Sequence, residues 1–302
     1  MEKIDKENLI MKLLSSYING NYKVSIFNDG TKIRENELDN LIPDFPESMD
    51  VKITNQCNIM CEYCHEDSKP DGQHGDIMSA KFIDSLAPYT EMAIGGGNPL
   101  AHPDLIEFLE KLKSNNVIAN ITVNQKHFLE NQPMLQNLVK QKMIYGIGVS
   151  LTKATDELLL CLNMFPNVVL HVINGIVSLK ELEILYDQDF KILVLGYKRF
   201  RRGEQFYCED IEVEKQDMYD NISEIAKHFK VVSFDNSAIK QLELKRILSK
   251  EKWNEFYMGD DGQFTMYIDL VNGKFARSST SEQRFDLKYN IKEMFEVVRN
   301  LK

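Results

Sequence analysis

The chain has 302 residues, 43% of them hydrophobic and 27% charged, and a formal net charge of −10. This composition is typical of a soluble globular protein that is long enough to bury a large core, and the negative charge disfavours nucleic acid as a partner. The first residues lack the apolar segment of a signal peptide, and no apolar run approaches the length of a membrane span. We therefore expect a cytoplasmic protein without membrane contact.

Residues 1–49 predict an accessory N-terminal segment. Residues 7–18 are amphipathic and predict a helix. Residues 22–34 alternate polar and apolar side chains around Asp29-Gly30, which is the signature of a β-hairpin. An exposed strand of this hairpin would offer an edge to which a peptide adds a further strand.

Residues 50–203 repeat a short apolar run followed by an amphipathic segment of helical length. This alternation predicts βαβ units, a parallel sheet and an α/β fold. We expect a partial (β/α)6 TIM-like barrel, and the pattern alone leaves an open doubly wound sheet as the alternative. The expected strands are 50–54, 92–97, 117–123, 144–151, 168–173 and 191–197, and the expected helices are 79–89, 102–114, 128–141, 154–163 and 178–187.

Residues 204–302 predict a C-terminal α+β extension, in which the strand–helix rhythm is lost. Its acidic pair Asp260-Asp261 either forms a turn or meets a basic group of a substrate. The expected elements are helices at 215–229 and 238–249, a short apolar run at 231–235, and a hairpin at 263–279 that turns at Asn272-Gly273.

Three of the five cysteines, Cys57, Cys61 and Cys64, directly follow the first expected strand of the barrel. An odd number of cysteines does not make a disulfide framework, and crowded thiolates select zinc or an iron–sulfur cluster. A [4Fe–4S] cluster on three cysteines leaves one iron open to a small molecule, whereas structural zinc needs a fourth ligand, for which His65 is available. Both metals stay open at this point, and the polar residues around the thiols disfavour three unligated core cysteines.

The pattern Cys57-x3-Cys61-x2-Cys64 after the first strand resembles that of the radical S-adenosylmethionine (radical SAM) superfamily. The resemblance implies that the cysteines hold a [4Fe–4S] cluster, whose open iron is chelated by the amino and carboxylate groups of SAM. It also implies that an electron, from a donor such as flavodoxin or ferredoxin, splits SAM into methionine and a 5′-deoxyadenosyl radical that abstracts hydrogen from the substrate. In this family an aromatic residue near the adenine commonly precedes the third cysteine, and Tyr63 stands there.

The segment 95-GGGNPL-100 at the end of the second expected strand resembles the Gly-Gly-Glu-like motif that receives the SAM ammonium in the same family. Gly96 and Gly97 would let backbone carbonyls approach the ligand, and the amide oxygen of Asn98 accepts a hydrogen bond. Asn98 stands where Glu is common, and the missing charge is a departure that would lower the affinity for SAM. A tight strand-to-helix turn is the alternative explanation of these glycines.

Polar residues also follow the later strands, where members of the family contact the ribose or the carboxylate of SAM. Ser150 and Asn174 are the preferred candidates, and capping or loop polarity is the alternative role of each. The further candidates are Asn124, Tyr197 and Lys198, the basic run 198–203 as an anion clamp, and His65 and His74 as proton relays. The alternative for the basic run is a solvated loop face, and the alternative for each histidine is an exposed loop position.

The C-terminal extension resembles an auxiliary-cluster (SPASM- or twitch-like) extension that has lost its cysteines. It contains only Cys208, which cannot hold a cluster by itself, and Cys161 is expected in the core. The resemblance implies a radical SAM enzyme with one catalytic cluster, for which we expect a peptide or protein side chain as substrate. The alternatives are a small metabolite or nucleoside as substrate, or a non-catalytic module that binds zinc or a structural cluster.

Overall fold

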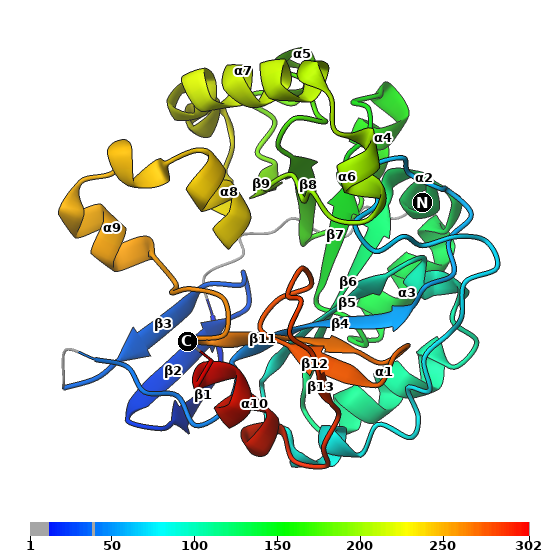
Figure 1. Cartoon of the computed structure of the whole chain (residues 1–302), viewed down its shortest axis with the longest axis vertical. Coiled ribbons are helices and arrows are strands. Elements are labelled where there is room, and N and C mark those ends of the chain that lie inside the picture. The colour runs from blue at the N-terminus through cyan, green and yellow to red at the C-terminus, as the bar shows by residue number, and fades with distance from the viewer. Residues whose placement is uncertain (1–11, 38–39, 302) are drawn as a thin grey trace.

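The computed structural model describes residues 12–37 and 40–301, and ten of the strands in this part of the chain form one sheet (Figure 1). Seven of these strands run in the order β10-β9-β8-β7-β6-β5-β4, each parallel to its neighbour, which confirms the predicted parallel α/β architecture. Their bounds are β4 (Ser48–Thr54), β5 (Glu91–Gly96), β6 (Ile118–Asn124), β7 (Gly146–Ser150), β8 (Val168–Ile173), β9 (Lys191–Leu195) and β10 (Val231–Phe234).

The C-terminal residues extend the same sheet beyond β4. Strand β11 (Thr265–Asp269) is parallel to β4, and β12 (Lys274–Ala276) and β13 (Phe285–Asp286) follow in antiparallel order. The predicted hairpin at Asn272-Gly273 is therefore confirmed, but its first strand also joins the barrel. The expected division of the chain at residues 49/50 and 203/204 stays a prediction.

Helices connect the parallel strands and differ from the expected ones at several places, including the expected helix 178–187, which ends at Glu183. Residues 79–89 contain only a 3-10 turn, and the expected helix 128–141 begins at Gln125 and is interrupted at Asn131. The expected helix 238–249 stops at Gln241, because Glu243 has a left-handed backbone with φ +46°. The helices are η1 (Lys81–Ser85), η2 (Pro99–Ala101), α1 (Leu105–Ser114), α2 (Gln125–Glu130), α3 (Gln132–Lys140), α4 (Asp156–Leu162), α5 (Leu179–Glu183), α6 (Arg202–Phe206), α7 (Glu209–Ile225), η3 (Ala226–His228), α8 (Asn236–Gln241), η4 (Leu244–Arg246), α9 (Lys250–Phe256) and α10 (Ile291–Arg299).

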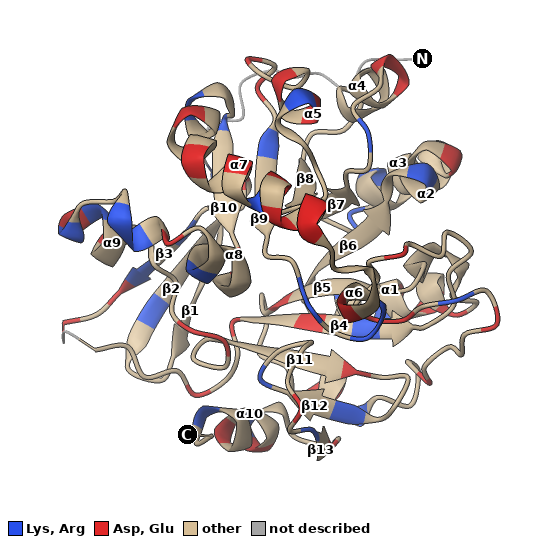
Figure 2. Cartoon of the chain, turned by 45° about the horizontal axis from the view of Figure 1, so that its top comes forward, with Lys and Arg blue, Asp and Glu red and all other residues tan. Residues whose placement is uncertain are grey.

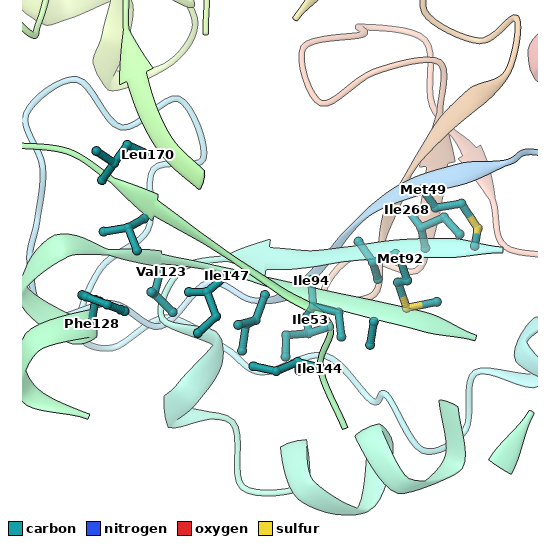
Figure 3. Packing of buried hydrophobic residues seen from close by; sticks show 14 of the residues in the cluster. Met49, Ile53, Met92, Ile94, Val123, Phe128, Ile144, Ile147, Leu170 and Ile268 are labelled. Carbon is teal, nitrogen blue, oxygen red and sulfur yellow. The ribbon is translucent and has the colours of Figure 1, made fainter. Parts of the chain in front are cut away.

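The main core lies between one face of the sheet and the helices that cover it, and Figure 3 shows part of this packing. Met49 and Ile53 of β4 are buried in this core. Because successive residues of a strand point to opposite faces, Asp50 and Lys52 lie on the face turned away from the core, which we call the inner face. The inner face also carries Ala93, Gly95, Asn120, Thr122, Asn124, Gly146, Gly148, Ser150, His171, Tyr267 and Asp269 of the neighbouring strands.

The N-terminal residues form a separate antiparallel sheet of β1 (Leu13–Asn19), β2 (Tyr22–Phe27) and β3 (Lys32–Glu35). The hairpin predicted at 22–34 is confirmed. The helix predicted at 7–18 is wrong where the structure describes it, since residues 13–18 are a strand, and residues 7–11 lie outside the described part. Pairing of β1 with β2 satisfies the backbone groups of β1 that face β2, and Tyr17 packs on Phe45 with 5.8 Å between ring centroids.

This small sheet lies at the N-terminal ends of the barrel strands, opposite the end where the cysteines follow β4 (Figure 1). Its residues Tyr22, Val24 and Ile26 pack with Ile118 and Phe264, at the starts of β6 and β11. The predicted peptide-binding edge is thus at the far end of the barrel from the cysteines. Among the described residues no helix is long and apolar enough to cross a bilayer.

Glu47 joins the two sheets through a buried cluster of polar contacts. Its carboxylate accepts hydrogen bonds from Tyr22 Oη at 2.6 Å and from Arg34 Nε at 2.8 Å, and Lys32 Nζ lies 3.4 Å away. Lys32 also reaches Glu91, at the start of β5, at 2.5 Å. A buried carboxylate is tolerated only with such partners, so Glu47 fixes the small sheet against the barrel.

Replacing Glu47 by Ala should lower the free energy of unfolding by about 3–5 kcal/mol, because buried cationic and hydroxyl groups lose their acceptor. Urea denaturation measures this loss. Glu35→Ala is the control, since Glu35 is exposed and pairs with Lys23 at 3.6 Å, and it should cost less than about 1 kcal/mol. Equal losses in the two variants would contradict a bridging role for Glu47.

The same variant should change the acid sensitivity of the protein. Burial alone would raise the pKa of Glu47, but Lys32, Arg34 and Tyr22 outweigh it and lower the pKa below the ordinary 4.5. The unfolded chain therefore takes up this proton first, so the stabilisation is complete above pH 4.5 and is lost as the pH falls through the folded pKa. When the pH is lowered below 4.5, the free energy of unfolding of Glu47→Ala should therefore fall less than that of the wild-type protein. Urea denaturation at several pH values measures this difference.

Candidate functional site

The three neighbouring cysteines lie on the loop that follows β4, and each side chain is partly exposed. Burial raises the pKa of the Cys61 thiol, and the nearby Cys64 and Cys57 raise it further, so the three sulfurs lie within electrostatic range of one another. Backbone contacts shape the loop: Cys64 N donates to Cys61 O at 3.1 Å, and Cys57 N donates to Lys69 O at 2.9 Å. The loop therefore presents three thiols as one group.

Two of the predicted residues lie directly beside these thiols. Tyr63 contacts the Cys61 thiol through its hydroxyl, and its ring packs on Phe206 at a centroid distance of 6.1 Å. Asn124, at the end of β6, directs Nδ2 toward Cys61 Sγ at 3.8 Å, and its Oδ1 caps α2 by accepting from Lys126 N at 2.9 Å. Both the capping role and the proximity to the cysteines thus hold for Asn124.

His65 does not join the cysteines as a fourth ligand here. Its Nε2 lies 3.6 Å from Glu66 Oε1, and burial lowers its pKa to about 3. Within residues 12–37 and 40–301, no three His, Cys, Asp or Glu side chains converge as ligands of a single metal ion. His74 lies elsewhere, with Nδ1 2.9 Å from Thr54 Oγ1 and its ring 4.8 Å from that of His102.

The glycine motif packs directly against the start of the cysteine loop. Gly97 N donates to Thr54 O at 2.8 Å, and Asn98 N donates to Gln56 O at 2.7 Å. Gly96 has φ +108°, and a Cβ on Gly97 would lie only 2.2 Å from Gln56 O. Both glycines are therefore required by backbone conformation and close approach.

The side chain of Asn98 has a local task that the sequence did not indicate. Its Oδ1 caps the short helix η2 by accepting from Leu100 N at 3.2 Å. One lone pair of this oxygen remains for another donor. The cap fixes the orientation of the amide relative to the glycine backbone.

The later candidates do not all gather at the same place. Ser150 ends β7 in register with Asn124 and His171, so it belongs to the inner face beside the cysteine loop. Asn174 is fully buried, and its Nδ2 donates to Gln241 Oε1 at 3.0 Å. Tyr197 is also buried, with its hydroxyl donating to Gly203 O at 2.7 Å. Ser150 is thus open to a ligand, while Asn174 and Tyr197 contact other protein groups.

The basic run 198–203 holds the cysteine loop in place (Figure 2 shows this segment, before α6, beside β4). Arg201 Nη1 donates to Glu66 O at 2.8 Å, and Arg202 Nε lies 3.1 Å from Asp67 Oδ1. Arg199 pairs with the exposed Glu204. Lys198 differs from these arginines. Its charge lowers the pKa of two residues of the inner face, Asp50 and His171.

Glu66, which sequence reasoning missed, is the centre of the contacts below the cysteines. Its buried carboxylate accepts from Lys52 Nζ at 2.8 Å and from Tyr267 Oη at 2.9 Å. Asp269, beside Tyr267 on β11, lies 3.9 Å from Lys52 Nζ and 3.4 Å from an Arg284 nitrogen. The one available signal was the pair of ionisable residues His65-Glu66 directly after the third cysteine, since a buried acid demands partners that the sequence does not identify.

The remaining cysteines lie apart from this loop. Cys208 is exposed at the start of α7, and Cys161 is partly buried against the core from α4. The expectation that Cys161 is a core residue therefore holds in part, because its side chain stays partly accessible.

Known proteins resemble this chain in part of its sequence or in its fold. The family model of the radical SAM superfamily matches residues 51–186. A probable GTP 3′,8-cyclase of Methanocaldococcus jannaschii is 30% identical over 135 residues, which are 43% of this chain and 44% of that protein. The chain thus spans less than half the length of this curated relative.

Solved structures extend the likeness over most of the chain. Streptococcus suis SuiB bound to S-adenosylmethionine superposes with a TM-score of 0.59 at 11% identity, over 95% of this chain and 91% of that chain. SuiB bound to the precursor peptide SuiA gives a TM-score of 0.57 at 14% identity, over 86% of this chain and 68% of that chain. At such identities the likeness shows a shared fold.

The glycine packing can be tested without any cofactor. Gly97→Ala should lower the free energy of unfolding by about 1–3 kcal/mol, because its Cβ meets backbone that cannot move aside cheaply. Gly95→Ala is the matched control, since a Cβ there meets nothing nearer than 3.7 Å, and it should change stability little. Urea denaturation measures the free energy of unfolding of the two variants. Equal values for Gly97→Ala and Gly95→Ala would contradict the close packing of Gly97 on Gln56.

Proposed function

The chain belongs to the radical SAM superfamily, and on this premise we propose that Cys57, Cys61 and Cys64 hold a [4Fe–4S] cluster in a radical SAM enzyme. The observation that carries the proposal is the group of three partly exposed thiols on a loop whose start packs against the backbone of Gly97 and Asn98. The superfamily uses such a cluster together with SAM.

The residues present suit this group chemically. Three thiolates are soft ligands, and the three cysteines of a cluster each bind a different iron, so they do not need to converge on one point. Their mutual electrostatic effect on Cys61 would favour a cation in their midst. His65 interacts with Glu66, which leaves the described surroundings with three thiols and no fourth ligand, as a cluster with one open iron requires.

We assign the SAM site to residues at the C-terminal ends of neighbouring strands. Gly96, Gly97 and Asn98 would receive the ammonium, and Ser150 would contact the ribose or the carboxylate. Gly96 is exposed and Ser150 is partly exposed. Tyr63 and Asn174 complete the proposed set, although Asn174 would have to leave Gln241 to reach a ligand.

With the cluster and SAM bound, reductive cleavage of SAM would supply a 5′-deoxyadenosyl radical for hydrogen abstraction from the substrate. The protein's own contribution is positioning. Arg201, Arg202 and Glu66 hold the cysteine loop against β4 and β11. Asn124 donates toward Cys61 Sγ, which would stabilise negative charge on that sulfur.

We further propose a peptide or protein side chain as the substrate. SuiB, which shares the fold, has been solved with a precursor peptide, and this supports the proposal by likeness. A nucleotide is the rival, since the sequence relative is a probable GTP cyclase. A flavodoxin or ferredoxin as electron donor and a cytoplasmic location also stay proposals.

Replacing Cys57, Cys61 and Cys64 together by Ala should abolish iron and sulfide binding and the formation of 5′-deoxyadenosine from SAM, because the cluster loses every protein ligand. Iron analysis and mass spectrometry after anaerobic reconstitution measure both quantities. The double variant Cys161→Ala and Cys208→Ala is the control and should retain both. Zinc in the purified protein, or deoxyadenosine formed by the triple variant, would overturn the assignment.

The proposed role of Asn98 predicts opposite effects of two substitutions. Asn98→Asp keeps the cap on Leu100 and adds a charge for the SAM ammonium, so SAM should bind several-fold more tightly, since charged hydrogen bonds are roughly twice as strong as neutral ones. Asn98→Ala should weaken binding. Calorimetric titration of SAM at equal iron content measures the difference, and the same affinity in all three proteins would exclude Asn98 from the site.

A further inference from the structure

One carboxylate of the inner face, that of Asp50, lacks a protein partner. Asp50 stands in the middle of β4, in register with Tyr267 of β11 and Ala93 of β5. Its side chain is exposed, although the residues before and after it are buried. No described residue donates a hydrogen bond to it or forms an ion pair with it.

The surroundings of Asp50 are open and polar, unlike the filled interior of a closed barrel. Asn120, Thr122 and His171 of the inner face are all partly exposed. Gly148 makes room for the ring of His171, because a Cβ there would lie 2.4 Å from that ring. Side chains in this part of the barrel are therefore accessible to a ligand.

The other acids near Asp50 have partners within the protein. Glu66 and Asp269 pair with Lys52, Arg201 and Arg284, as described above. Asp235 Oδ1 accepts from Gly196 N at 2.9 Å and from Ala238 N at 2.7 Å, and Asp261 Oδ1 accepts from Asn236 Nδ2 at 2.7 Å. Asp50 is the exception in this set.

Among the charged groups that influence Asp50 most, acids outnumber cations. Although the side chain of Asp50 is accessible, the protein atoms around it inside the barrel limit its hydration and raise its pKa; Lys198 lowers this pKa, and Asp261, Asp235 and Glu66 raise it further. Lys198 is the one cation among these influences, and its Nζ donates to Ser279 Oγ at 3.1 Å. An open carboxylate among further carboxylates gains most from a positively charged ligand.

From these contacts we propose that Asp50 binds the positively charged end of the substrate side chain, so that the enzyme acts on a peptide at or next to a lysine or arginine. The inference rests on the proposed function and deepens it. Asp50 lies four residues before Thr54, which is about 13 Å along the strand at about 3.3 Å per residue. A side chain therefore reaches Asp50 only if its own backbone enters the mouth of the barrel, and a long side chain needs the smallest such entry.

The same arrangement opposes a nucleotide substrate. The triphosphate of GTP would need unpaired cations, whereas Lys52, Arg201 and Arg284 already contact Glu66 or Asp269. Lys198 alone would face Asp50, Asp235 and Asp261. The acidic pair noted in the sequence therefore contributes Asp261 to the negative field, while Asp260 accepts from Tyr257 Oη at 2.8 Å in a local turn.

The test uses four probes on the reconstituted protein with SAM present: Nα-acetyl-lysine methylamide, its uncharged norleucine analogue, its glutamate analogue, and GTP. Ligand-observed NMR titrations give each dissociation constant. The lysine probe should bind at least about tenfold more tightly than the other three, since hydrogen bonds between charged partners are stronger than those between neutral ones. Asp50→Asn should remove this preference.

Asp286→Asn is the matched control, because Asp286 is exposed on β13 and pairs with Lys274 at 2.6 Å, and it should keep the preference. Circular dichroism verifies that each variant folds. Should Asp50→Asn fail to fold, the ranking of probes by the wild-type protein decides alone. Equal binding of lysine and norleucine, tighter binding of GTP, or a lysine preference that survives in folded Asp50→Asn would overturn the proposal.

Formation of 5′-deoxyadenosine by the same preparation separates this inference from the proposed function. An Asp50-dependent lysine preference without deoxyadenosine would support the binding site and count against the radical chemistry. Deoxyadenosine without any lysine preference would support the chemistry and overturn the role of Asp50.

Discussion

The buried carboxylate of Glu66 is the constraint on which the candidate site depends. It follows the third cysteine by two residues, and its oxygens accept from Lys52 of β4 and from Tyr267 of β11. Arg201 binds the backbone of the same residue from the loop after β9. One residue thus fixes three distant segments to the cysteine loop, and removing one partner of such a buried ion pair typically costs about 3–5 kcal/mol.

This constraint gives the C-terminal residues a role in the barrel. Strand β11 lies beside β4 and supplies Tyr267 and Asp269 to the inner face, so the extension completes the site although it holds no cysteine cluster of its own in the described residues. The N-terminal sheet lies at the opposite end of the barrel, where Tyr22 and Arg34 attach it to Glu47. The barrel is therefore covered at one end and carries its thiols and glycines at the other.

Local patterns predicted much of this molecule. The six barrel strands follow from apolar runs, and the cysteine and glycine motifs identify the loops at the ends of β4 and β5. What local patterns could not give is pairing between distant segments. Residues 13–18 read as part of a helix but pair with β2, and nothing near Thr265 indicates that β11 joins β4. The importance of Glu66 and Asp50 emerges only from that register, because each is an ordinary acid until its neighbours across the sheet are known.

We propose that the three cysteines hold a cluster to which SAM binds. Electron paramagnetic resonance of the anaerobically reconstituted and reduced protein, recorded with and without SAM, is the measurement that addresses this. We expect the signal of a reduced [4Fe–4S] cluster that changes when SAM is added, because SAM would coordinate the open iron. A protein that takes up no cluster, or a cluster signal that is indifferent to SAM, would contradict it.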